Sequence, residues 1–441
     1  MIRRFLFAAA LLLVHSELRA EPSDAEKHGF ASKFIIYNAK GPADSCGPGC
    51  DRWIAVEGQV DTDAAARIRR FLSNVKDTKR PIYFHSPGGV VEQSYAIGRL
   101  LRSRKTIARI GRTIVAACAG GTQVDAACLK IKTGGGESEA QLETRNAMCN
   151  SACSYLFLGA TTREVAPDAV VGVHNSRLTL VVHGHPPPRL EEQFRERGME
   201  KANRERIAFV ASMGISRELD DLIKTVKFES IHVLTRAELY RFGIDTRSTI
   251  EGSWALESWP RTSIFKSALV RKADGFDFRR VGWRLACGNG DNARLTFVNQ
   301  VDKNATRAGS VVLLLGPEKR LAFNRSSGTA GYEFWNVAVA PDTLKAMFSM
   351  PRVQMEENIS PASGNAAQNI LEFDSGGLED GWKKVSASCG AGEPVGVPRA
   401  SGPPAFMASP AARVTTTRPE PGSMWPGVKP VPPAVATPAE H

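Results

Sequence analysis

Beyond its first residues, the sequence lacks any apolar run long enough to cross a membrane. A spanning helix needs about 20 apolar residues in succession, and the apolar stretch at residues 5–14 is too short for this. Arg3 and Arg4 precede that stretch and the small residue Ala20 follows it, which is the arrangement of a secretory signal peptide. We therefore expect residues 1–20 to direct export to the periplasm or the medium. We expect the mature chain to have no integral membrane span.

The sequence also lacks a block of like charge. The formal net charge is +11, and about +9 remains once three arginines and one glutamate of the leader are removed. The basic residues are scattered among acidic neighbours, and aromatic residues are not interleaved with them as they are on nucleic-acid surfaces. We interpret the excess charge as solvated surface and expect no nucleic-acid partner.

A metal-ligand set is missing as well. Cys46 and Cys50 would need a second Cys or His pair at ligand spacing, and none follows. We predict no metal and no other cofactor. Export favours disulfides among the eight cysteines. Cys287 and Cys389 bracket the later part of the chain and are expected to pair, whereas the pairing of the others stays open.

What the sequence does have is an alternation of short strand and helix patterns. Strands are predicted at residues 53–57, 81–85 and 106–110, and helices at residues 61–75 and 90–103. This order is typical of an α/β fold with parallel strands covered by helices. Residues 120–143 are polar and glycine-rich and are expected to form an exposed loop. The next elements are predicted at residues 149–159 (helix), 170–174 (strand), 190–213, 216–226 and 235–242 (helices).

A chain of 441 residues exceeds what one hydrophobic core usually organises. After residue 250, short apolar runs are separated by Gly, Asn and Asp turns, which predicts a β-rich accessory domain. After residue 390, Pro, Ala, Ser and Gly dominate, which predicts a disordered tail. The predicted divisions are a signal peptide (1–20), an α/β domain (21–250), the β-rich domain (251–390) and the tail (391–441).

Three features in the α/β part match the needs of acyl-transfer chemistry, which requires a nucleophile, a base and backbone donors for an oxyanion. The turn Ser86-Pro-Gly-Gly89 lies between a predicted strand and helix, where glycines let a substrate approach the backbone. Ser151 lies at the start of a predicted helix, and His174 lies at the end of a predicted strand. The sequence therefore offers all three requirements of an acyl-transfer hydrolase.

The region from Trp53 to Asp245 resembles the ClpP-like serine peptidases on these motifs, together with Gly159 and Pro167. The resemblance implies the spiral of ββα units shared with crotonases, and a periplasmic serine endopeptidase that acts on peptide or protein substrates as a homo-oligomer. It also implies that Ser151 is the nucleophile and His174 the base. The oxyanion donors implied are Gly88, Gly89 and the N–H of Ala152.

The sequence departs from the family pattern in three places. Ser154 lies one helical turn after Ser151 and is an alternative nucleophile. The acidic third member has no clear counterpart, which leaves a Ser/His dyad open. The cysteines on either side of Ser151 are expected to brace the helix start rather than react. The candidates for the third member are Asp221, Thr225 and Glu229.

Two other classes of function compete with the peptidase. One is a catalytically inactive ClpP-like protein that binds peptides or acts as a scaffold in the envelope. The other is a crotonase-type acyl-CoA enzyme, which shares the glycine turn but needs neither the serine nor the histidine; export argues against it, since acyl-CoA substrates are cytoplasmic. His85, beside the glycine turn, is expected to pack or to form a hydrogen bond.

Overall fold

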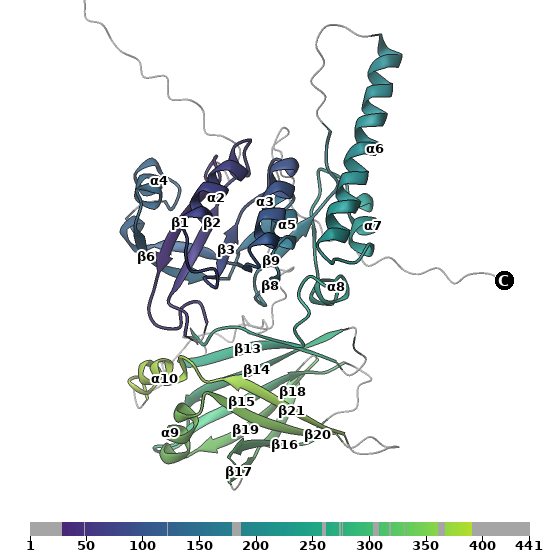
Figure 1. The fold of residues 1–441 in the computed structure, drawn as a ribbon. Helices are drawn as coiled ribbons and strands as arrows, with labels where there is room; N and C mark the ends of the chain where they lie inside the picture. Colours follow the sequence, from purple (N-terminus) through teal and green to yellow (C-terminus); the bar gives the residue numbers. More distant parts are fainter. Residues whose placement is uncertain are drawn as a thin grey trace, which may run out of the picture.

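The computed structural model describes residues 29–389 except 48, 121, 179–186, 258–261, 273–274, 276, 303–307, 317–318, 330 and 360–366. The predicted signal peptide and tail therefore lie outside the described residues. The protein is a mixed α/β protein with several sheets, and its C-terminal part is rich in β-structure (Figure 1).

A seven-stranded sheet organises the N-terminal part, in the order β5-β6-β1-β2-β3-β4-β8. Strands β2, β3, β4 and β8 are mutually parallel, so their carboxyl ends meet at one edge of the sheet. In open α/β sheets, ligands bind at this edge. The strands are β1 (Ile35–Lys40), β2 (Arg52–Glu57), β3 (Ile82–His85), β4 (Ile107–Ile110), β5 (Arg112–Val115), β6 (Glu137–Glu143) and β8 (Thr162–Glu164).

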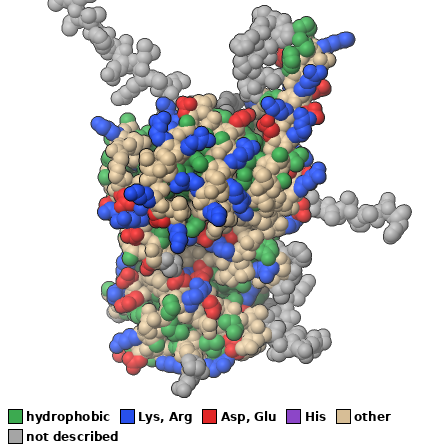
Figure 2. Space-filling view, viewed as in Figure 1, with side chains coloured by type: hydrophobic (Ala, Val, Ile, Leu, Met, Phe, Trp, Pro, Cys, Tyr) green, Lys and Arg blue, Asp and Glu red, His purple; other side chains and the backbone are tan. Residues whose placement is uncertain are grey.

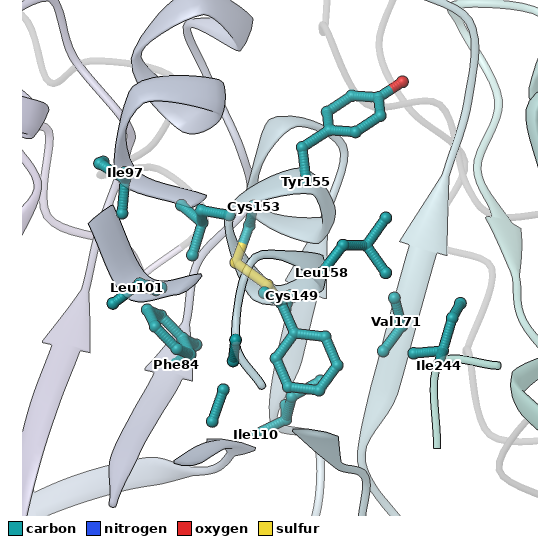
Figure 3. Close-up of a cluster of buried hydrophobic side chains, with 14 of the residues drawn as sticks. Phe84, Ile97, Leu101, Ile110, Cys149, Cys153, Tyr155, Leu158, Val171 and Ile244 are labelled. Atoms are coloured by element: carbon teal, nitrogen blue, oxygen red, sulfur yellow. A yellow bond between two sulfur atoms is a disulfide. The ribbon is translucent and has the colours of Figure 1, made fainter. Parts of the chain in front are cut away.

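Three helices, α2 (Ala64–Ser73), α3 (Val91–Ser103) and α5 (Ala152–Leu158), contribute to the main core of this part. Helices α3 and α5 cross closely, because a Cβ atom built on Gly159 would lie 2.2 Å from the Cα of Gly98. Figure 3 shows the side chains that fill this core around α5, including Phe84 of β3 and the disulfide between Cys149 and Cys153. The core thus fixes the helix that begins directly after Ser151.

The prediction of an exposed loop at residues 120–143 was wrong. This segment contains helix α4 (Ala126–Thr133) and strand β6, and it follows the short 3-10 helix η1 (Ala116–Cys118). Asp125 caps α4 through the N–H of Cys128, and a disulfide joins Cys128 to Cys118. The polar sequence was misleading because Lys132, although charged, is buried and pairs with Glu57 at 2.7 Å.

A smaller sheet, in the order β10-β9-β7, lies next in the chain. Its strands are β7 (Met148–Asn150), β9 (Val170–Val173) and β10 (His232–Val233), and the helices that follow β9 are α6 (Pro188–Ser212), α7 (Glu218–Thr225) and α8 (Arg236–Arg241). The N-terminal turns of α6 project beyond the body of the molecule and carry charges of both signs (Figures 1 and 2). A buried ion pair between Arg206 and Asp220, at 2.6 Å, joins α6 to α7.

The C-terminal part has a second core of its own, between two antiparallel sheets and around Trp283. One sheet has the order β11-β13-β14-β15-β19-β18 with β12 beside β13, and the other has the order β17-β16-β20-β21. The elements are β11 (Thr249–Glu251), β12 (Ala255–Glu257), β13 (Ser263–Arg271), β14 (Phe278–Cys287), β15 (Ala293–Gln300), β16 (Ala308–Leu315), β17 (Lys319–Ala322), β18 (Asn324–Thr329), β19 (Tyr332–Val339), α9 (Pro341–Ser349), β20 (Arg352–Ile359), β21 (Ala367–Asp374) and α10 (Leu378–Ser386).

All eight cysteines are paired. The disulfide between Cys287 and Cys389 confirms the pairing expected from the sequence, and Cys46 pairs with Cys50. Four disulfides are consistent with an exported protein in an oxidising compartment. Among the described residues, we find no helix with both the length and the apolar character that a membrane span requires.

Candidate active site

Ser151 connects the end of β7 to the start of α5 in an unusual backbone conformation. Its φ of 55° and ψ of −126° lie outside the regions that residues with a side chain normally adopt. Such a conformation costs on the order of 1–3 kcal/mol and persists only where the surroundings impose it. Here the N–H of Ser151 donates to the carbonyl of Gly172 at 2.8 Å, and the buried helix α5 follows directly.

The structure brings His174 against Ser151. His174 follows strand β9 and is only 7% exposed, and its Nε2 atom lies 2.6 Å from the Oγ of Ser151. Its Nδ1 atom lies 2.6 Å from the carbonyl oxygen of Phe228. Because a carbonyl can only accept, the proton of the neutral ring is assigned to Nδ1, which leaves the Nε2 lone pair free to accept the serine hydroxyl proton.

The ring of His174 also stacks on the ring of Phe228, with centroids 5.1 Å apart. Burial lowers the pKa of His174 below its ordinary value of 6.5, while the Phe228 carbonyl and the charge of Glu229 act in the opposite direction. The histidine is therefore neutral at pH 7 and able to take up a proton.

None of the three side chains considered from the sequence as the acidic member is placed on the Nδ1 of His174. The hydroxyl of Thr225 donates to the carbonyl of Leu222, and Asp221 pairs with Lys224. Glu229 pairs with Arg177 at 2.8 Å, with both side chains more than half exposed. The partner of Nδ1 is the backbone carbonyl of Phe228, which sequence reasoning missed because every residue has such a group.

Ser154 occupies a different position from Ser151. It is 2% exposed, and its hydroxyl donates to the carbonyl of Ser151 at 2.6 Å within the first turn of α5. Its hydrogen bond therefore supports the helix start rather than engaging His174.

The glycine turn lies directly against Ser151. A Cβ atom built on Gly88 would lie 2.6 Å from the Cβ of Ser151, and the φ of Gly88 is +108°. The turn is held in place because the N–H of Ser86 donates to Met148 at 2.9 Å and the N–H of Asn150 donates to Ser86 at 3.1 Å. Only glycine permits so close an approach with this backbone conformation.

The N–H of Gly88 already has a partner within the turn. The N–H of Gly88 donates to the Oγ of Ser86 at 3.2 Å. Gly89 has a φ of +142° and lies against the backbone of Val60, where a Cβ atom would be 2.2 Å from the carbonyl oxygen. Ala152 is the first residue of α5, and the N–H groups of a first helical turn have no partner within their helix.

The disulfide between Cys149 and Cys153 spans Ser151, and both cysteines are fully buried. It links the end of β7 to the first turn of α5, and so restrains both flanks of the strained serine. His85 forms the hydrogen bond expected of it, accepting the N–H of Met148 on its Nδ1 atom at 3.2 Å.

Comparison with known proteins gives no family assignment. No family model matches the chain, and no curated protein matches it. Among solved structures, invasion associated protein B from Bartonella henselae aligns with 31% of this chain and 96% of its own, at 8% identity and a TM-score of 0.25. A mutant of a membrane-bound stomatin-specific protease aligns with 42% of this chain and 73% of its own, at 15% identity and a TM-score of 0.26.

Proposed function

We propose that the protein is an exported serine peptidase of the ClpP-like type, which hydrolyses peptide bonds with Ser151 as nucleophile and His174 as base. The observation that carries this proposal is the 2.6 Å contact between the Oγ of Ser151 and the Nε2 of His174. Further support comes from the strained backbone of Ser151 and the glycine turn packed against it. Strained residues of this kind cluster at active sites.

In the proposed mechanism, His174 takes the hydroxyl proton while the Oγ of Ser151 attacks the peptide carbonyl carbon. The protonated imidazole then donates that proton to the leaving amine, and the acyl group remains on Ser151 until water, activated by the same histidine, releases it. The proposed oxyanion donors are the N–H groups of Gly89 and Ala152. Gly88, whose N–H is engaged by Ser86, leaves room for the nucleophile instead.

We propose a Ser/His dyad rather than a triad. The carbonyl of Phe228 holds the imidazole in the required tautomer and orientation, as a carboxylate does in a triad. A carbonyl carries no full negative charge, so it stabilises the imidazolium less than a carboxylate would. Glu229 supplies a negative charge nearby without contacting the ring through a hydrogen bond.

The α/β part (21–250) is proposed as a ββα spiral of the ClpP/crotonase kind that assembles into a homo-oligomer. The β-rich part (251–390) is proposed as an accessory domain, followed by a tail (391–441). Residues 1–20 are proposed to direct export to the periplasm, which agrees with the four disulfides.

A fluorophosphonate probe tests the proposal, because it reacts with activated serines. We expect the purified, oxidised protein to be labelled, and peptide mapping by mass spectrometry to place the adduct on Ser151. The matched control is Ser154→Ala, which we expect to keep its labelling. An adduct on Ser154, or no labelling of the folded protein, would contradict the assignment.

The rate of labelling should depend on pH through His174. Because burial holds the pKa of His174 below 6.5, we expect a plateau near neutral pH and a loss of rate only when the pH falls below 6.5. Glu229→Gln removes a charge that raises this pKa, so the loss should shift to lower pH. Rate profiles at low salt measure the shift, and a Glu229→Gln profile displaced to higher pH would refute the electrostatic role.

One observation favours a second candidate, a catalytically inactive peptide-binding protein of the envelope. Within the part of the chain that the structure describes, no carboxylate is bonded to the Nδ1 of His174, and the carbonyl found there gives weaker support to a charged imidazole. The same labelling experiment separates the two candidates. A correctly folded protein that is never labelled but binds peptides would favour the inactive relative.

A further inference from the structure

A polar cavity lies near the proposed active site and has no role in the mechanism above. Its lining includes Glu57 and His85, the last residues of β2 and β3, and Arg112 at the start of β5. Thr113 of β5 also lines it, and the opposite side includes Gln123 and Lys132, which belong to the segment 120–143 that was predicted to be a loop. The cavity therefore lies at the carboxyl edge of the parallel strands, between the sheet and this segment.

The charges in the cavity do not cancel. Glu57 accepts from the Nζ of Lys132 at 2.7 Å and from the N–H of Thr113 at 3.2 Å, so one carboxylate is matched by one buried ammonium. Arg112 remains. Its guanidinium lies 3.5 Å from Glu143 in a pair whose side chains are 35% and 51% exposed, and such surface pairs contribute little. The guanidinium of Arg112 thus remains in the cavity as a positive charge whose ion pair with Glu143 is weak.

His85 adds a hydrogen-bond donor. Its Nδ1 accepts the N–H of Met148, so the proton of the neutral ring is assigned to Nε2. The ring is neutral because burial lowers the pKa of His85 to about 3, with smaller effects from the charges of Arg112 and Lys132. The cavity therefore offers a guanidinium and a neutral N–H donor together, which is a suitable pair for a carboxylate.

The cavity is within reach of Ser151. Met148, which contacts His85, is three residues before Ser151, and a fully extended chain of three residues spans at most about 11 Å. His85 also immediately precedes the turn that packs against Ser151. A group bound in the cavity would therefore belong to a substrate residue a few positions from the scissile bond.

We propose that this cavity is a substrate subsite that binds a carboxylate of the peptide through Arg112 and His85. The inference deepens the proposed peptidase function and rests on it. The carboxylate has two possible sources, an acidic side chain near the scissile bond or the C-terminus of the peptide. The first makes the protein selective for acidic sequences, and the second makes it act close to chain ends.

Binding to the full mature chain carrying Ser151→Ala tests the subsite without cleavage. The probes are fluorescein-labelled hexapeptides of Ala and Leu in which one position carries Glu or Gln, each with a free or an amidated C-terminus. Fluorescence anisotropy gives the affinities. If an acidic side chain is bound, we expect the Glu peptide to bind at least about tenfold more tightly than the Gln peptide at one position. If the C-terminus is bound, we expect the same difference between the free acid and the amide. A difference of this size is that of a charge-assisted hydrogen bond.

Arg112→Gln should abolish this preference, and Arg112→Lys should restore part of it. The matched control is Arg145→Gln, which changes an exposed arginine of the neighbouring turn and should leave the preference intact. Circular dichroism and thiol titration of each variant show that the fold and the disulfides are kept.

Equal binding of the charged and neutral probes, or a preference that survives Arg112→Gln, overturns the subsite. Failure of the subsite is distinguishable from failure of the peptidase. Labelling of Ser151 in the parent protein without any carboxylate preference leaves the peptidase standing alone. A preference that depends on Arg112 in a protein that is never labelled supports the binding cavity and removes the peptidase.

Discussion

Replacing His174 with alanine is expected to lower the rate of fluorophosphonate labelling and of peptide hydrolysis on the order of 10⁴-fold or more. The serine hydroxyl is a weak nucleophile without a base, and the Nε2 of His174 is the group placed 2.6 Å from it. Rates of labelling and of cleavage of an unfolded protein substrate, measured on the oxidised variant, check this expectation.

His232→Ala is the matched control for this experiment. His232 pairs with Val173, the residue before His174, but its ring contacts Glu238 at 3.0 Å. Loss of the His232 ring should lower the rates of labelling and cleavage far less than loss of the His174 ring. The double variant Ser151→Ala and His174→Ala should be no slower than Ser151→Ala alone, because groups that act as a unit are not additive. A His174→Ala protein that keeps a tenth of the wild-type rate would refute the dyad.

Gly88→Ala is expected to lower the rate of Ser151 acylation by about 100-fold or more, with the fold retained. The added methyl group would lie 2.6 Å from the Cβ of Ser151 and 2.7 Å from the carbonyl of Asn150, so the serine or the turn must shift. A displacement of about 1 Å at a reacting group can cost on the order of 100-fold in rate. Labelling kinetics, together with the midpoint of thermal unfolding, separate the effect on the site from the effect on stability.

Gly47→Ala is the control, because Gly47 has the same φ of +108°. Among the described residues beyond its chain neighbours, a Cβ atom there would meet only the side chain of Arg109, at an ordinary distance of 3.6 Å. Both variants carry the backbone cost of a side chain at positive φ, and only Gly88→Ala disturbs Ser151. Equal rates in the two variants would show that contact with the glycine turn does not position the nucleophile.

The alternating strand and helix patterns predicted the bounds of β2, β3, β4 and α3 to within a residue or two. These elements follow local rules, because the short apolar runs of buried parallel strands and the apolar residue at every third to fourth position of a helix appear directly in the sequence. Residues 120–143 did not follow them. The burial of Lys132 depends on Glu57, which lies 75 residues earlier in the chain, so the polar pattern of α4 gave no sign of it.

The sequence by itself determined the order of the glycine turn, Ser151 and His174, and the strand and helix ends on which they lie. Only the tertiary structure decided which groups of the site contact one another. It set the Oγ of Ser151, rather than that of Ser154, against a histidine 23 residues away. It also placed the carbonyl of Phe228 on the Nδ1 of that histidine. The physical reason is that a backbone carbonyl is the same at every residue, so only the path of the folded chain selects the one that orients the base.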